Sequence, residues 1–208
     1  RDIRGAAIDY YLDQEMEEVE LSVLTGENEI IYQSEGSGKI GFHRLNWNLA
    51  VQGKTAANSR RRSSGPKVVP GTYMVHLEMD GKTQIMPLEV VADPRIVASG
   101  MTQADFEEQF ALCVKVMELR SEANAFAVVV DSLFKNEELR TKNQNISVVK
   151  DELRGTGGIY PQPMLLSQIG YLYSMISRAD QEPGNQAYIR YDELKSQLKF
   201  LKQKIEKR

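Results

Sequence analysis

The hydrophobic pattern changes its period partway along the 208-residue chain, and this change constrains the fold more than any single motif. Before residue 94, apolar and polar residues alternate, as in Val19-Glu20-Leu21-Ser22-Val23-Leu24, which is typical of half-buried strands. After residue 94, apolar residues recur every three or four positions, which is typical of amphipathic helices; one such stripe is Leu165, Ile169, Leu172 and Ile176. The order predicts an α+β chain of two domains, a β-domain over residues 1–97 and an α-helical domain over residues 98–208.

The first half reads as short strands joined by turns. Strands are expected over residues 7–12, 19–24, 29–32, 41–49, 73–79 and 83–91. In the fourth of these, His43, Leu45 and Trp47 share one face. The clearest turn is Asp80-Gly81, because both positions of a two-residue hairpin loop need positive φ. Several short strands at this spacing predict an immunoglobulin- or fibronectin-like β-sandwich.

Two polar segments interrupt the strands. Residues 51–69 carry Arg60-Arg61-Arg62 and almost nothing apolar, so a mobile surface loop is expected there, with a functional loop as the alternative. Gly36-Ser37-Gly38-Lys39 has the composition of a phosphate loop. It lacks the Walker spacing and lies between two strands, so a hairpin connection is expected.

The second half predicts an antiparallel three-helix bundle. A capping box at Thr102-Gln103-Ala104-Asp105 starts the first helix. Its expected buried stripe is Phe106, Phe110, Cys113 and Met117. Asn143-Gln144-Asn145 predicts a kink, which divides the bundle into four segments. The last helix carries a heptad-like seam formed by Tyr191, Leu194, Leu198, Leu201 and Ile205.

Charge and composition exclude several classes of function. Residues 1–97 hold 11 basic and 14 acidic residues, and residues 98–208 hold 15 of each, so neither half has the basic surface of a nucleic-acid-binding domain. No run of about 18 apolar residues exists, so no membrane span is expected. The single cysteine, Cys113, excludes an intrachain disulfide and is expected to be a small buried hydrophobe.

The titratable residues do not form a catalytic pattern. Carboxylates pair at 107–108, 137–138 and 192–193, but neighbours on a helix point about 100° apart rather than across a cleft. His43 and His76 are the only histidines, too few for a histidine metal cluster. We therefore expect no enzyme, with no catalytic residue, no cofactor and no metal site.

Three motifs resemble a known protein family. They are Gly41-Phe42-His43-Arg44-Leu45-Asn46-Trp47-Asn48-Leu49, the stretch 70–82 beginning Pro-Gly-Thr-Tyr, and the stretch 87–95 ending Asp-Pro-Arg. Together with the helical tail, they resemble the C-terminal region of secreted proteins that bear a sortilin-like β-propeller, often labelled glycosyl hydrolases for their Asp-box repeats. The chain departs from that family in Asn48, where an acidic residue is usual, and in the arginine-rich insertion.

The resemblance implies a non-catalytic accessory module of a larger exported protein. Any hydrolase chemistry would then belong to an upstream β-propeller, which the module braces, or else the module binds a protein partner. The resemblance also implies an extracytoplasmic location, whether periplasmic, at the cell surface or secreted. The first residues, Arg1-Asp2-Ile3-Arg4-Gly5, have the character of a cut from a longer chain.

Three other functions stay open. A carbohydrate-binding module would place Tyr10, Tyr11 or Trp47 in an exposed row on one sheet face, although the phase of Trp47 favours the core. Because Tyr10 and Tyr11 are adjacent in a strand, one of the two rings is expected to be exposed. A secretion-sorting domain is disfavoured because such sandwiches normally end the chain. Homodimerisation through the helices would leave an apolar stripe uncovered in the monomer.

Overall fold

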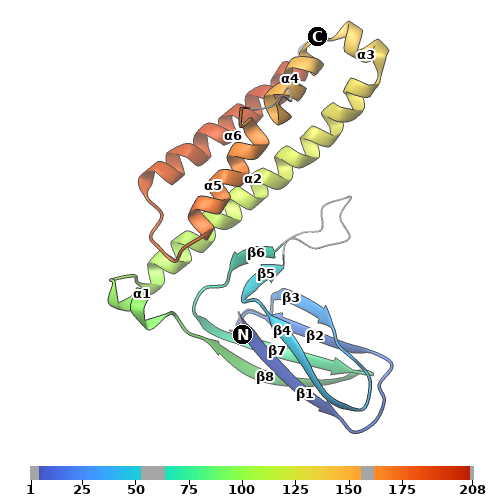
Figure 1. Ribbon diagram of the computed structural model, residues 1–208, viewed down its shortest axis with the longest axis vertical. Helices are drawn as coiled ribbons and strands as arrows, with labels where there is room; N and C mark the ends of the chain where they lie inside the picture. Colours follow the sequence, from blue (N-terminus) through green and yellow to red (C-terminus); the bar gives the residue numbers. More distant parts are fainter. Residues whose placement is uncertain (1–4, 53–63, 156–161, 207–208) are drawn as a thin grey trace. The chain divides into compact units, whose positions relative to one another are not determined.

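The computed structural model describes residues 5–52, 64–155 and 162–206 and has a mixed α+β fold, with antiparallel sheets followed by helices (Figure 1). Contacts divide the chain into two compact units, Arg1–Phe110 and Ala111–Arg208. This division falls within the helix Gln103–Lys135, whereas the boundary expected after residue 97 lies before the start of that helix.

The described part of the first unit contains eight strands. They are β1 (Ala6–Leu12), β2 (Val19–Leu24), β3 (Ile30–Glu35), β4 (Gly41–Trp47), β5 (Ala50–Gln52), β6 (Ser64–Lys67), β7 (Gly71–Met79) and β8 (Lys82–Val90). They form a four-stranded sheet in the order β3-β2-β7-β8 and two antiparallel pairs, β1-β4 and β5-β6. Pro87 lies in β8, an edge strand, where a residue without an N–H is tolerated.

The β1-β4 pair and the four-stranded sheet share one hydrophobic core. Its largest fully buried side chains include Trp47 and Leu12 from the pair and Leu21 from the sheet, each no more than 2% exposed. The Trp47 indole N–H donates a hydrogen bond to the Ala50 carbonyl at 3.0 Å. The burial expected for Trp47 from its phase in the strand is therefore confirmed.

The turn at Asp80-Gly81 is confirmed in its backbone geometry. Asp80 has φ 47° and Gly81 has φ 80°, and β7 pairs with β8 on either side of them. The Asp80 carboxylate also accepts hydrogen bonds from the backbone N–H groups of Glu17 and Glu18. This turn therefore closes the β7-β8 hairpin and also holds the residues that immediately precede β2.

Three expectations for the first half need correction. The surface loop expected over residues 51–69 has short strands at both of its ends, where β5 pairs with β6, because backbone hydrogen bonds do not need apolar side chains. Arg60-Arg61-Arg62 lies outside the described residues. The segment 36–39 is not a hairpin connection, since β3 pairs with β2 and β4 pairs with β1. The fourth strand ends at Trp47, because Leu49 turns the chain with φ 56°.

Within the residues that the structure describes, six helices follow the strands. They are α1 (Pro94–Ala98), α2 (Gln103–Lys135), α3 (Glu137–Lys142), α4 (Asn145–Arg154), α5 (Leu165–Ser177) and α6 (Asn185–Glu206). Asp93 caps α1, and hydrogen bonds from Arg95 lower the pKa of the Asp93 carboxyl to about 2. Among the described residues, no helix is long and apolar enough to cross a membrane.

The predicted capping box at the start of α2 is confirmed. The Thr102 N–H donates to the Asp105 carboxylate at 2.7 Å, and the Asp105 N–H donates to the Thr102 hydroxyl at 3.3 Å. The predicted stripe is offset, because Phe106, Phe110 and Met117 are only half-buried. The buried face of α2 consists of Leu112, Cys113, Val116, Leu119, Ala123, Ala127 and Val130.

The described residues of the second unit form a hydrophobic core, to which α2, α4, α5 and α6 all contribute. The expected stripe of α5 is confirmed as buried; it consists of Leu165, Ile169, Leu172 and Ile176. The expected centre of the α6 seam is also buried; it consists of Leu194, Leu198 and Leu201.

The break expected near Asn143 is also confirmed, since the Asn143 side chain accepts a hydrogen bond from the Asn145 N–H at 3.0 Å. A second break was not expected: Asn136 ends α2 and caps α3.

Candidate functional site

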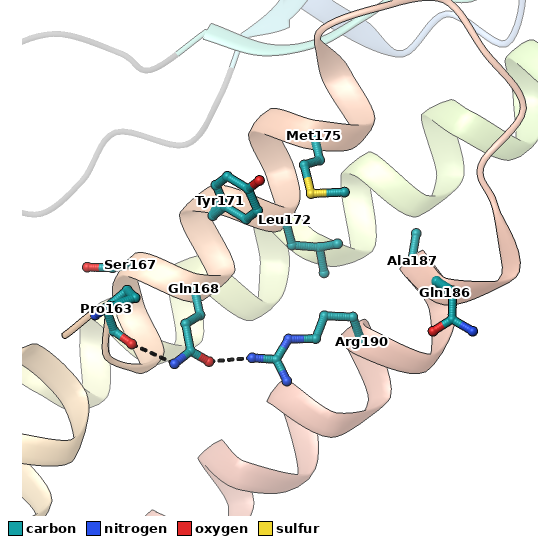
Figure 2. A pocket seen from close by; sticks show the side chains of 9 residues that line it. All are labelled: Pro163, Ser167, Gln168, Tyr171, Leu172, Met175, Gln186, Ala187 and Arg190. Carbon is teal, nitrogen blue, oxygen red and sulfur yellow. Dashed lines mark hydrogen bonds between the residues drawn. The ribbon is translucent and has the colours of Figure 1, made fainter.

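A half-open apolar pocket of about 760 Å³ lies between α5 and α6. Figure 2 shows its lining, which comprises Pro163, Ser167, Gln168, Tyr171, Leu172, Met175, Gln186, Ala187 and Arg190. All nine residues belong to the second unit. The volume is within the usual range for binding pockets in proteins, about 300–1,000 Å³.

The pocket follows from the sequence of α6. Leu194 and Leu198 lie on the buried face of this helix, and Arg190 and Ala187 lie one and two turns before Leu194 on the same side. Alanine is too small to fill the space beside α5, and arginine keeps its charged end near water. The helix pair is therefore left hollow beside Ala187 and Arg190.

The wall from α5 combines a buried floor with exposed apolar rims. Leu172 is 3% exposed and belongs to the core, whereas Tyr171 is 69% exposed and Met175 is 50% exposed. Tyr171 and Met175 are four residues apart, so they stand on neighbouring turns of one helix face. Exposed aromatic and methionine side chains beside a hollow are typical of surfaces that bind partners.

A line of hydrogen bonds crosses one end of the pocket (Figure 2). The Arg190 guanidinium donates to the Gln168 side-chain oxygen, and the Gln168 amide donates to the Pro163 carbonyl at 2.6 Å. Arg190 also forms an ion pair with Glu193 at 2.6 Å. These contacts fix the orientation of Arg190, while the side chains of both charged residues stay about half exposed. A ligand carboxylate could compete with Glu193 for the guanidinium.

The fold does not bring Tyr10, Tyr11 and Trp47, the residues expected to bind a ligand, together on one exposed face. Tyr10 is 8% exposed, and its hydroxyl donates to the Ser37 carbonyl and accepts from the Ser37 N–H. Trp47 is fully buried, while Tyr11 is 57% exposed. The expectation that only one of the two adjacent tyrosines is exposed is confirmed. Tyr11 instead pairs with Phe42, which is 85% exposed.

The paired carboxylates and the two histidines differ in their exposure. All six paired carboxylates, at 107–108, 137–138 and 192–193, are exposed. His43 is half-buried, with its ring 5.1 Å from that of Tyr10, and His76 is half-buried on β7. Cys113 is buried as expected, and burial raises the pKa of its thiol to about 11.

No family model matches the chain, and no curated protein matches it either.

Proposed function

We propose that the chain is a non-catalytic accessory module that docks onto a protein partner through the α5–α6 pocket. The pocket is the observation that carries the proposal: it joins an apolar floor, exposed Tyr171 and Met175 rims, and one oriented cation, Arg190. Protein interfaces favour this combination of an apolar centre, aromatic and methionine side chains, and arginine.

The partner we infer is a β-propeller of the same exported protein. The resemblance of residues 41–49, 70–82 and 87–95 to the tail of secreted sortilin-like β-propeller proteins supports it. In this proposal, the sheets form an immunoglobulin- or fibronectin-like sandwich and the helices form a three-helix bundle. The module would act outside the cytoplasm, and any glycosyl hydrolase activity would belong to the propeller.

The pocket suggests what the partner must present. An apolar side chain would enter between Leu172 and Ala187, and a neighbouring carboxylate would pair with Arg190. An aspartate or glutamate beside a leucine or an aromatic residue fits this description. Desolvation of the contact would strengthen the ion pair relative to a pair on an open surface.

Calorimetric titration of the chain with the separately produced propeller region tests the proposal. Met175→Lys places a charge on the rim of the pocket, and we expect it to weaken binding about tenfold or more. Val128→Lys is the matched control, because Val128 on α2 is 51% exposed and Met175 is 50% exposed. Circular dichroism would verify that both variants stay folded.

Two outcomes would contradict the proposal. One is the absence of heat of binding between the folded chain and the propeller region. The other is a chain that is dimeric by light scattering and becomes monomeric with Met175→Lys, which would assign the pocket to a second copy of the chain.

A further inference from the structure

The outward face of the β1-β4 pair carries an ordered row of side chains. The register places Ala7 opposite Asn46, Asp9 opposite Arg44, and Tyr11 opposite Phe42, and all six residues are exposed. The alternate residues of both strands point into the core or its margin. The row is therefore a true outer surface of the sheet, because the pleat directs its side chains away from the core.

One end of the row is aromatic. The rings of Tyr11 and Phe42 lie 4.8 Å apart at an angle of 51°. Phe42 is 85% exposed, the largest value among the exposed large hydrophobic side chains in the described part of the chain. A cross-strand aromatic pair can stabilise a sheet even when its rings are partly covered. Because the Phe42 ring is so exposed, a ligand that covers it would bury apolar surface.

The next pair along the row is polar and held in place. Arg44 donates two parallel hydrogen bonds to Asp9, from Nε at 2.6 Å and from Nη2 at 2.7 Å. The hydrogen bond from Arg44 lowers the pKa of the Asp9 carboxyl, which therefore stays an acceptor at neutral pH. Two residues along a strand correspond to about 7 Å, so the ion pair stands close beside the aromatic pair.

We propose that this face, formed by Tyr11, Phe42, Asp9, Arg44 and Asn46, binds a neutral glycan. A pyranose ring has a face of C–H groups that can lie on Phe42 and a rim of hydroxyl groups. Those hydroxyls both donate and accept, so they can bond to the free lone pairs of Asp9 and to the remaining N–H groups of Arg44 and Asn46. The row has no net charge because the ion pair is internal, which fits a neutral polyhydroxylated ligand better than a polyanion.

This site is independent of the α5–α6 pocket and of the partner proposed for it. The two lie in different compact units and share no residue. A failure of one proposal would therefore leave the other unaffected, and each has its own variants.

Affinity electrophoresis of the chain in native gels tests the glycan site. The gels would contain xylan, hydroxyethylcellulose, mixed-linkage β-glucan, galactomannan or amylopectin, with heparin as the anionic comparison. We expect at least one of the neutral polysaccharides to retard the chain, with little retardation by heparin. Phe42→Ala should weaken that retardation about tenfold, since an exposed ring contributes most of the contact.

The controls separate a lost ligand contact from a lost fold. Phe200→Ala removes another exposed phenylalanine, 59% exposed on α6, and should leave the retardation unchanged. Arg44→Gln should weaken the retardation while the circular dichroism spectrum stays that of the wild type. Unretarded migration in every neutral gel, equal retardation of Phe42→Ala and the wild type, or retardation by heparin alone would overturn the proposal.

Discussion

Trp47 is the residue on which the core of the first unit most depends. It is fully buried, its ring lies 5.7 Å from Tyr73 and 6.3 Å from Tyr32, and its N–H satisfies the Ala50 carbonyl. We expect Trp47→Ala to lower the free energy of unfolding by about 3–5 kcal/mol, because it leaves both a cavity and a buried carbonyl without its donor.

Urea denaturation followed by circular dichroism would measure this change. Tyr11→Ala is the control, since Tyr11 lies on the exposed face of a neighbouring strand and should cost about 1 kcal/mol or less. Equal losses in the two variants would contradict the assignment of Trp47 to the core.

Cys113 should titrate far above an ordinary thiol. Burial raises the pKa of the Cys113 thiol to about 11 from an ordinary value near 9, because the thiolate would lack water. The folded pKa lies above the unfolded one, so this contribution to stability is fully present below about pH 9 and is lost as the pH rises through about 11. An NMR titration of the ¹³Cβ resonance should give a midpoint near 11 in the folded chain and a lower one in urea. A midpoint near 9 in both would contradict the burial of the thiol.

Single residues were predictable from the sequence where strand or helix phase decides their surroundings. The phases of Trp47 and Leu172 predicted burial, and both are buried. Phe42 and Arg190 gave no comparable signal of function. The proposed glycan-binding role of Phe42 depends on Tyr11, which lies opposite it on β1. The proposed partner-binding role of Arg190 depends on the pocket that Ala187 leaves beside α5. Such relations join residues distant in sequence, which local periodicity does not report.

At the scale of elements, the β7–β8 turn offers a matched test of backbone strain. Gly81 has φ 80° and Gly26 does not have positive φ, while a Cβ at either position would meet no atom within 4 Å. Gly81→Ala should therefore lower the free energy of unfolding by about 1–2 kcal/mol through conformation alone. Gly26→Ala should change it much less. Urea denaturation of the two variants would measure the difference, and equal stabilities would contradict the turn geometry.

The existence of most elements was predictable, whereas strand pairing was not. Alternation identified β2, β4 and β7, and Asp80-Gly81 identified the β7-β8 hairpin. β1 pairs with β4, and β2 and β3 lie between them in the sequence, so no local turn motif predicts this pairing. The β5-β6 pair was missed because its strands are only three and four residues long and show no alternation of apolar and polar residues. There, the Gln52 side chain exchanges two hydrogen bonds with the backbone of Gln33 on β3, which helps to hold β5 beside that strand.

For the whole molecule, the change of hydrophobic period predicted sheets followed by helices, and the structure has that order. The chain has a net charge of −3 and no basic half, which agrees with protein and neutral glycan ligands rather than nucleic acid. The proposed docking role depends on the α5–α6 pocket and on the resemblance of residues 41–49, 70–82 and 87–95. The two candidate sites lie in separate units, so one module could bind two ligands.

Hydrogen–deuterium exchange, measured for the chain alone and with saturating propeller region, is the most direct test of docking through the α5–α6 pocket. We expect slower exchange of the backbone amides in α5 and at the start of α6, around Tyr171 and Arg190, with little change in the β1-β4 pair. Unchanged exchange in both helices, with the propeller region present in excess, would contradict docking at the pocket.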